Sequence, residues 1–395
     1  MTSRTAFRAQ AKAWATGIAI APAALLLTIS APQAQLLVSA QDGKAVLVDG
    51  VNTVPATPAA DHVVIVDLGA SPPKLIGEVA VPTSVVGPPQ SVAVAADESI
   101  ALVTSAMKID PADPKKLVPD DRLSVIDLKA NPPAVLATLR AGQGAAGVSI
   151  NRAGTLALVA NRSEGTISIF KVDGKTLTPA GKLDLGNDKS GPSHVVFSPD
   201  GMSAVVSRDG DNKISILSID GDKVTYTKRD ATAGLRPYSL EISGNGDIAA
   251  VGNIGVGQGD ADTVSIIDLK AKPARVVETV TVGQTPEGIR LSPDGKYLAV
   301  TVMNGSNKPK SSPFFNDYGL VKVFGIDGMK LTPVAEAKVG HWCQGAAWSK
   351  DSKQLIVQCM VENELQTFGF DGKSLKAEAP IKLKASPAGM RTAQW

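Results

Sequence analysis

The chain alternates short apolar runs with polar turns, and one such arrangement recurs along its length. Residues 291–300 read LSPDGKYLAV, in which two apolar segments flank a Pro-Asp-Gly turn. Short apolar runs rich in Val, Ile and Leu that are separated by turn residues predict β-strands, and the turn predicts a hairpin. Segments with the same layout lie at residues 93–103, 149–159, 196–206, 241–251 and 347–357.

The repeated hairpin belongs to a larger unit of constant design. The residues just before the six turns are 45 to 57 positions apart in the chain. Each hairpin is followed by a third apolar segment that often ends in Asp, such as VSIIDL at 264–269, and then by a fourth, such as 276–283. Four short strands in a unit of this length predict one blade of a β-propeller.

The two ends of the chain together supply one further blade. We expect strands at 44–50, 62–68 and 74–82, without an opening strand, and residues 386–395 have the pattern of an opening strand with nothing after it. Pairing the C-terminal strand with the three N-terminal ones leaves no free sheet edge. The sequence therefore predicts an all-β fold, a seven-bladed β-propeller of four-stranded blades whose ring is closed in this way.

Residues 1–34 have the layout of a secretory signal peptide. Basic residues precede an apolar run at 13–29, and small residues follow it up to Ala34. We expect this segment to be removed and residues 35–395 to form a single propeller domain in the periplasm or outside the cell, the alternative being a retained membrane anchor. No later stretch approaches the ~20 apolar residues that a spanning helix needs.

Charge excludes several classes of partner. The chain has 40 basic and 38 acidic residues, and without residues 1–34 it has 37 and 38, a net charge of −1. The two signs are interleaved along the chain, which argues against a nucleic-acid or anionic-membrane partner. We expect a monomer that binds a small polar ligand or a protein partner and needs no cofactor.

Unusually long connections between second and third strands are expected on one face of the propeller. They span residues 49–62, 105–122, 253–262 and 302–319, whereas the hairpin turns on the other face have four or five residues. Insertions gathered on one face usually mark the binding face, although tolerated surface variation is the alternative.

The residues that precede the first strands should ring the mouth of the central channel on that face. Together with nearby cations and histidines they predict a polar funnel, suited to a ligand with hydroxyl or carboxylate groups. Taken singly, His194 and His341 are better explained as satisfied strand-end histidines, and Arg236 and Glu287 are explained by pairing with each other or with solvent. The candidate ligand-binding residues are Gln90, Ser193, His194, Arg208, Arg236, Tyr238, Glu287, His341 and Gln344.

The amino-acid pattern of the repeats resembles that of a known protein family. The pattern G-x-x-P-x-G-x-x-x-SPDGKYLAVT, together with VSIIDL, resembles the YVTN-type repeat propellers, with their WD40-like repeats, and the wider lactonase-like seven-bladed superfamily. The resemblance covers residues 35–395 and implies the fold. It implies no single activity, because propellers have many unrelated functions.

The lactonase branch offers a residue-by-residue comparison. Its Pro-His-x-Val motif corresponds to Pro192-Ser193-His194-Val195, so the histidine stands one place late, and on a strand one place exchanges the faces. Tyr238 and Ser239 occupy the positions of the family's Arg-His pair. Asn253-Ile254 stands in place of Asn-Glu, so the asparagine is present and the acid is missing.

Three functions remain in view. The leading hypothesis is an exported binding protein for a small polar ligand, a glycan or a protein partner. The first alternative is a hydrolase or isomerase of sugar-derived lactones, with His194 as base beside Arg236 and Glu287. The second is a scaffold subunit of an envelope or redox complex, for which the aromatic segment 314–318 would be an exposed anchor.

The two cysteines are placed for a disulfide. Cys343 lies eight residues before Asp351 and Cys359 lies eight after it, so a hairpin that turns at Asp351 sets them opposite each other. Opposed strand positions are within disulfide reach, and an oxidising compartment favours the bond, the alternative being two buried free thiols.

No metal or cofactor site is predicted. The three histidines fall in separate blades, without the spacing of a metal-binding pair. The acidic runs 208–212 and 259–262 lack an EF-hand pattern and are better explained as solvated turns. The glycine-rich segment 255–259 starts no helix, so it is not a dinucleotide-binding motif.

Overall fold

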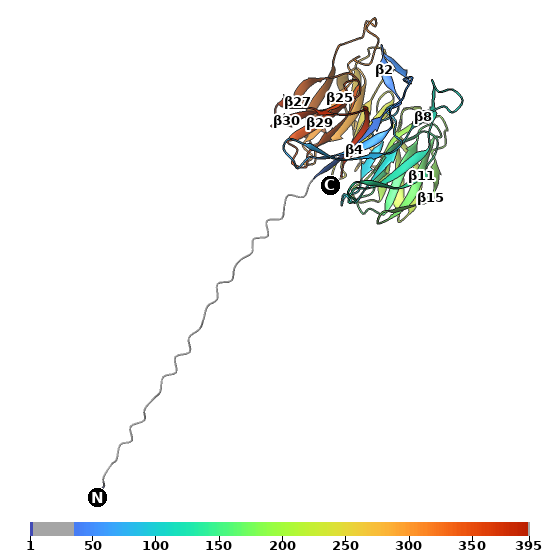
Figure 1. Ribbon diagram of the computed structural model, residues 1–395. Coiled ribbons are helices and arrows are strands. Elements are labelled where there is room, and N and C mark those ends of the chain that lie inside the picture. Colours follow the sequence, from blue (N-terminus) through green and yellow to red (C-terminus); the bar gives the residue numbers. More distant parts are fainter. Residues whose placement is uncertain (3–34, 394–395) are drawn as a thin grey trace. The chain divides into compact units, whose positions relative to one another are not determined.

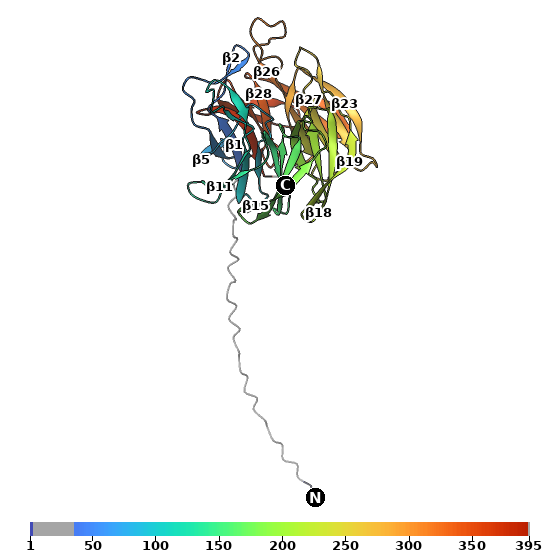
Figure 2. The ribbon, with the colours of Figure 1, turned by 90° about the vertical axis from the view of Figure 1, so that its right-hand side faces the viewer.

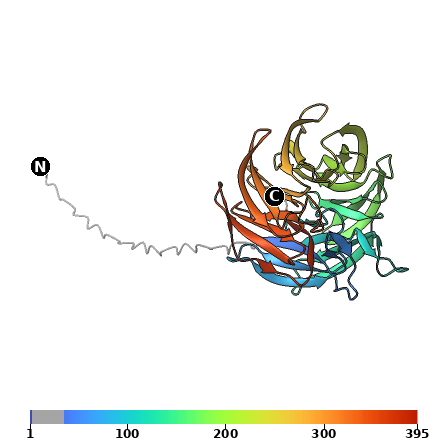
Figure 3. The same ribbon diagram turned by 90° about the horizontal axis from the view of Figure 1, so that it is seen from above.

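The structure, a computed structural model, describes residues 1–2 and 35–393, and its secondary structure consists of β-strands. Seven sheets of four strands, the last with an additional short strand, form a ring around an axis, along which Figure 3 looks. This confirms the predicted seven-bladed propeller. Residues 3–34 of the predicted signal peptide lie outside the described residues. No helix in the described part is long and apolar enough to cross a membrane.

Each blade consists of antiparallel strands, and the blades are numbered here from the N-terminus. From the axis outward, blade one contains β33 (Ser386–Thr392), β1 (Leu36–Asp42), β4 (His62–Asp67) and β5 (Lys74–Ala80). Blade two contains β6 (Val92–Val94), β7 (Ile100–Thr104), β10 (Arg122–Asp127) and β11 (Ala134–Arg140). Blade three contains β12 (Ala145–Ile150), β13 (Leu156–Asn161), β14 (Thr166–Asp173) and β15 (Thr176–Asp184). Blades four to seven contain β16 (Pro192–Phe197), β17 (Ser203–Arg208), β18 (Lys213–Asp220) and β19 (Lys223–Ala231); β20 (Pro237–Ile242), β21 (Ile248–Asn253), β22 (Asp262–Asp268) and β23 (Arg275–Gly283); β24 (Pro286–Leu291), β25 (Tyr297–Val302), β26 (Gly319–Asp327) and β27 (Lys330–Val339); and β28 (Cys343–Trp348), β29 (Gln354–Cys359), β30 (Glu364–Phe370) and β31 (Leu375–Ala377), with β32 (Ile381–Lys382) beside β30.

The C-terminal strand closes the ring, as predicted. β33 pairs antiparallel with β1, from Leu37 opposite Thr392 to Asp42 opposite Ser386. All seven residues of β33 are buried. The first blade is therefore assembled from both ends of the chain, and its innermost strand is the last one of the sequence.

One strand of the first blade was predicted wrongly. The strand between β33 and β4 is Leu36–Asp42, whereas the run 44–50 contributes β2 (Val46–Val48), which pairs with β3 (Val51–Thr53) in a hairpin within the connection. Polar residues interrupt the apolar pattern of the true strand, so the sequence does not predict it. Their side chains can be buried because they form hydrogen bonds inside the fold. Gln41 donates to Ser39 Oγ at 2.8 Å, and Asp42 accepts the backbone N–H of Val85 at 2.7 Å.

The recurrent turn is held by one set of side-chain hydrogen bonds. In blade four, Ser198 Oγ donates to Asp200 Oδ1 and accepts the backbone N–H of Ser203 at 3.0 Å. Gly201 follows with a φ of 72°, a conformation that favours glycine. The hydroxyl thus ties both ends of the turn together, which explains why Ser precedes it so often. The same pairs of bonds occur in the turns that begin at Ser243, Ser292 and Ser349.

Neighbouring blades pack face to face through apolar side chains. Between blades six and seven, Val321 and Val323 belong to the same buried cluster as Trp348 and Phe370, and the last two rings lie 5.3 Å apart. A single blade would leave both faces of its sheet exposed to water. The ring buries them, and this accounts for the repetition of one hairpin along the chain.

The long connections lie together at one end of the ring, called here the loop face, and the Ser-containing turns lie at the other, the turn face. The loop-face connections include the hairpin of β8 (Met107–Ile109) and β9 (Leu117–Pro119). β2 and β8 are both at the upper end in Figure 1, and β2 is again at that end in Figure 2. This arrangement agrees with the expected lopsided distribution of insertions.

The loop-face connections also contact one another. The backbone N–H of Lys310 donates to Asp49 at 3.0 Å, which joins the connections of blades six and one. Phe314 packs so closely over Gly259 that a Cβ there would lie 2.1 Å from its ring. Lys338 lies 4.0 Å above the ring of Tyr318. The aromatic segment is therefore packed in part against neighbouring regions of the propeller, while Phe314 remains among the exposed large apolar side chains, at 37%.

Cys343 and Cys359 form the predicted disulfide between directly opposed positions of β28 and β29. Because the bond closes a loop of 16 residues, its removal is expected to cost about 3 kcal/mol of unfolding free energy. A melting curve of Cys343→Ala/Cys359→Ala should lie below that of the wild type, and dithiothreitol should shift the wild type alone. Identical melting temperatures with and without the reductant would contradict this expectation.

Candidate functional site

The predicted ring residues lie at the loop-face ends of the innermost strands. Gln90 stands just before β6, and Ser193, Tyr238, Glu287 and Gln344 stand near the starts of β16, β20, β24 and β28. All five are buried. Equivalent positions in five blades thus place polar side chains around the channel, and what each of them contacts distinguishes a binding site from ordinary packing.

A charged group at this mouth joins three blades. Arg162 follows β13, Asp209 follows β17, and Arg236 precedes β20. Asp209 Oδ2 accepts hydrogen bonds from Arg162 Nη2 at 2.5 Å and from Arg236 Nη2 at 3.1 Å. The carboxylate side chain is 3% exposed, whereas the two arginine side chains are 35% and 37% exposed. These three side chains therefore carry a net charge of +1, with one buried anion between two accessible cations.

Tyr238 and Glu287 complete this group, named here the loop-face cluster: Arg162, Asp209, Arg236, Tyr238 and Glu287. The guanidinium carbon of Arg162 lies 5.8 Å from the centre of the Tyr238 ring. Burial raises the pKa of Tyr238, although the charge of Arg162 opposes this shift. The phenol is therefore neutral and able to donate a hydrogen bond.

Glu287 is the member whose charge at neutral pH is altered by its surroundings. Burial raises its pKa to about 8, and the opposing effects of a hydrogen bond from Trp342 and of the charges of Arg236 and Arg162 are smaller. Trp342 Nε1 donates to Glu287 Oε2 at 3.3 Å. At neutral pH the carboxyl group is therefore mostly protonated and offers an O–H donor. Strongly perturbed carboxyl groups of this kind are concentrated at functional sites.

His194 lies in a different electrostatic environment from Arg236 and Glu287. Burial, together with the charge of Arg391, lowers its pKa to about 3, so the imidazole is neutral. The histidine packs against Gly147 of blade three. Its Nδ1 is buried without a hydrogen-bond partner among the described residues. The structure thus associates His194 with charges deeper in the channel, and Arg236 and Glu287 with the loop-face cluster.

Two other predicted cationic residues are engaged locally. Arg208 is buried within blade four, where Nε donates to Asp211 at 3.0 Å and Nη1 donates to Tyr226 at 3.1 Å. His341 lies between Glu362 and Asp317, at 2.7 and 3.1 Å. Burial lowers the pKa of His341, but these two carboxylates outweigh it and the net shift is upward. Both side chains already have counter-charges of their own.

The two predicted amides differ in how their polar atoms are used. Gln344 Nε2 donates to the backbone oxygens of Val85 and Ala388, both at 3.3 Å, and so ties blade seven to its neighbours. The Oε1 atoms of Gln344 and Gln90 are buried without partners among the described residues. Ser193 Oγ donates to Asp209 Oδ1 at 3.1 Å and supports the loop-face cluster.

The sequence analysis did not identify Arg162 and Asp209, although their equivalent positions in adjacent repeats indicated that they could interact. Both residues stand directly after the second strand of a blade, and Asp209 is preceded by the arginine to which a ligand-binding role was assigned. Comparing equivalent positions of adjacent repeats would have shown a cation facing an anion. The contact itself depends on the distance between blades, which a single sequence does not reveal.

A second charged group, also missed, spans the channel closer to the turn face. Glu241 lies on β20, Arg290 on β24 and Arg391 on β33. Glu241 Oε1 accepts from Arg290 Nη1 at 3.0 Å and from Arg391 Nη1, and Oε2 accepts from Arg391 Nη2 at 3.3 Å. The three side chains are at most 8% exposed. Since blades one and five are on opposite sides of the ring, Arg391 reaches across the axis.

The pKa shifts of this channel network follow from its charges. Burial raises the pKa of Glu241, but Arg290 and Arg391 outweigh it, so the net shift is downward and the carboxylate is ionised. Burial and the adjacent Arg290 lower the pKa of Arg391 to about 10. Two cations therefore share one anion. The sequence carried an indication of these charges, because the equivalent positions of four other blades are uncharged, at Ala93, Ser149, Val196 and Ala347.

One group of potential metal ligands occurs within the described residues, made of Cys343, Cys359 and Glu362. The two sulfur atoms are joined in the disulfide and are not available as thiolates. The group is therefore not a metal site in the oxidised protein.

Comparisons with known proteins identify the fold. No protein-family model matches the chain. Antigen Lp49 of Leptospira interrogans (serogroup Icterohaemorrhagiae, serovar copenhageni, strain Fiocruz L1-130) is 28% identical over 219 residues, which cover 52% of this chain and 43% of Lp49. The chain thus matches less than half the length of that curated relative.

Solved structures match over nearly the whole propeller. A putative 6-phosphogluconolactonase from Bacteroides uniformis is 18% identical, with a TM-score of 0.70, and the match covers 91% of this chain and 99% of that one. The periplasmic gluconolactonase PpgL of Pseudomonas aeruginosa is 16% identical, with a TM-score of 0.63 and coverages of 90% and 99%. At such identities the likeness concerns the fold alone: the chain is a seven-bladed β-propeller of the architecture found in lactonase-like proteins.

Proposed function

We propose that this protein is an exported binding protein for a small anionic molecule rich in hydroxyl groups, of the sugar-acid type, which it takes up at the loop-face cluster. The observation that supports this most directly is the sharing of one buried carboxylate, Asp209, by two half-exposed guanidiniums. Arginine binds carboxylates in a bidentate manner, and Arg162 and Arg236 have N–H groups to spare. A ligand carboxylate would balance the excess positive charge.

The neutral members of the cluster suit the hydroxyl groups of such a ligand. Tyr238 and the protonated Glu287 are donors beside the two arginines, and their raised pKa values keep them neutral at physiological pH. A site that combines cations with neutral donors favours a polyhydroxylated carboxylate over a neutral sugar. Export rests on residues 1–34 and is supported by the disulfide, because such bonds persist in oxidising compartments.

Lactone hydrolysis or isomerisation is the second candidate function. Two observations favour it: a protonated carboxyl group, Glu287, lies beside the guanidinium of Arg236, and structural neighbours are named gluconolactonases. A general base within reach of the same ligand is also required. The contacts of His194 involve the channel network instead, so binding without turnover is the stronger proposal.

Thermal shift and calorimetry with gluconate, glucono-δ-lactone and glucose test the proposal. We expect gluconate to raise the melting temperature most, because a ligand of the folded state stabilises it by about 2.7 kcal/mol at 100 times its Kd. Arg236→Gln should weaken gluconate binding about tenfold, since a charge-assisted contact is lost. Arg275→Gln, on the exposed outer strand β23, should behave as wild type.

Two results would separate the candidate functions. Equal stabilisation by glucose and gluconate, or none by either, would contradict the proposed anion site. Opening of the lactone faster than in protein-free buffer, abolished in Glu287→Gln and retained in Arg275→Gln, would favour the lactonase alternative.

A further inference from the structure

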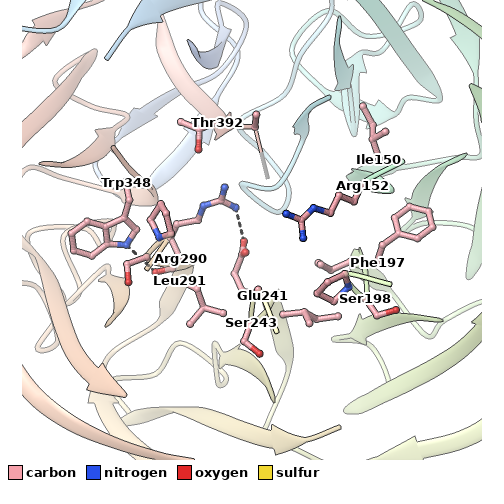
Figure 4. A pocket seen from close by; sticks show the side chains of 17 residues that line it. Ile150, Arg152, Phe197, Ser198, Glu241, Ser243, Arg290, Leu291, Trp348 and Thr392 are labelled. Atoms are coloured by element: carbon pink, nitrogen blue, oxygen red, sulfur yellow. Dashed lines mark hydrogen bonds and ion pairs between the residues drawn. The ribbon is translucent and has the colours of Figure 1, made fainter. Parts of the chain in front are cut away.

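The turn face has a cavity of its own at the opposite mouth of the channel (Figure 4). It has a volume of about 100 Å³ and is formed where β16, β20 and β24 run into their turns, with the end of β33 on one side. We call it the turn-face pocket. The residues that matter for its chemistry are Arg152, Phe197, Glu241, Arg290, Trp348 and Thr392.

Positive charge predominates in this pocket. Arg290 is bound to Glu241, which also binds Arg391 behind the wall, and these three buried side chains carry a net charge of +1. Arg152 comes from the turn of blade three, is exposed, and has no polar partner for its side chain among the described residues. Figure 4 shows its guanidinium pointing toward Glu241 across the pocket. With Arg152 the net charge is +2, and a cavity with such an excess attracts anions.

Few other polar groups are available to a ligand. The hydroxyls of Ser198, Ser243 and Ser292 are used in their own turns. The Thr392 side chain has no polar partner within the described part of the chain, and Arg290 uses a single N–H in binding Glu241. Polar binding capacity is therefore concentrated in Arg152, Arg290 and Thr392.

The rest of the wall is apolar and comes from several blades. Side chains without polar groups surround the charged side, and the Trp348 indole N–H is already bound to the backbone oxygen of Arg290 at 3.1 Å. A ligand for this cavity needs an anionic end and a body that displaces water from apolar surface. The apolar lining residues include Ile150, Val196, Phe197, Ile242 and Leu291.

We propose that the turn-face pocket binds a small carboxylate with an apolar body, its carboxylate beside Arg152 and Arg290 and its body against the apolar part of the lining. The small volume limits the body to about the size of one ring. Glu241 does not exclude such an anion, because Arg290 and Arg391 already neutralise it. This site lies at the opposite mouth from the loop-face cluster and is independent of the function proposed there.

Benzoate is a suitable probe, with benzamide as its neutral counterpart and inorganic phosphate as an anion without an apolar body. Calorimetric titration of the whole protein should give benzoate an affinity at least about tenfold above both, because each comparison removes one of the two required features. Arg152→Gln should weaken benzoate about tenfold and leave the melting temperature of the free protein unchanged, because the side chain is exposed.

Arg236→Gln, at the loop face, is the matched control, and benzoate should bind it as it binds wild type. This variant also separates the two proposals, since it is expected to lose affinity for gluconate only. Equal binding of benzamide, tighter binding of phosphate, or an unchanged benzoate affinity in Arg152→Gln would each overturn the proposed site.

Discussion

A chain that ends at Ala385, and therefore lacks β33, is expected to lose at least about 5 kcal/mol of unfolding free energy, or to fail to fold. Two losses add up: the buried side chain of Met390, worth about 2–3 kcal/mol, and the backbone hydrogen bonds between β33 and β1, worth about 0.5–1.5 kcal/mol each. The edge of β1 is also left unpaired. Differential scanning calorimetry of the truncated and full chains measures the effect.

The matched control restores the missing strand. A synthetic peptide of residues 386–395, added to the truncated chain, should recover much of the stability in proportion to its concentration, because it binds the folded state alone. A truncated chain that melts at the temperature of the full chain would show that the ring does not depend on this strand.

Glu241→Gln is expected to destabilise the protein by about 3–5 kcal/mol, because it leaves Arg290 and Arg391 buried without a counter-charge. The pair of half-buried Lys322 and exposed Glu336 provides the comparison, since Glu336→Gln should cost less than about 1 kcal/mol. Chemical denaturation of the two variants side by side measures both effects.

The pH dependence of this difference provides a separate check. Because the folded-state pKa of Glu241 lies below its ordinary value of 4.5, its stabilising contribution is complete above that value and is lost as the pH falls through the lower, folded-state pKa. The gap between wild type and Glu241→Gln should therefore be constant near neutral pH and narrow in acid. A double variant, Glu241→Gln/Arg391→Met, should be less destabilised than Glu241→Gln; if it is not, the buried cation is not the cause.

Much of the fold is predictable because the repeated unit is local. A hairpin with its short polar turn is specified by adjacent residues, so blades two to seven could be assigned from the sequence, although only the turns at Ser198 and Ser292 read Ser-Pro-Asp-Gly. The disulfide followed from the equal distances of Cys343 and Cys359 from Asp351. The first blade was harder, since Leu36–Asp42 is a strand through its pairing with β33, and its Ser, Gln and Asp side chains give no apolar alternation.

The candidate sites were less predictable because they depend on contacts between blades. The sequence identified Arg236, Tyr238 and Glu287 at one mouth, but not Asp209, which brings two arginines together there. His194 was grouped with them by its place near a strand start, whereas its electrostatic neighbours come from deeper in the channel. The reach of Arg391 across the axis to Glu241 depends on ring closure and side-chain length, which no local pattern encodes.

The channel network of Glu241, Arg290 and Arg391 also affects what a ligand would contact near the axis of the propeller. Because Arg391 belongs to blade one and Glu241 to blade five, their ion pair crosses the axis at the wall of the turn-face pocket. A ligand in the turn-face pocket would therefore contact a network that ties blades one, five and six together.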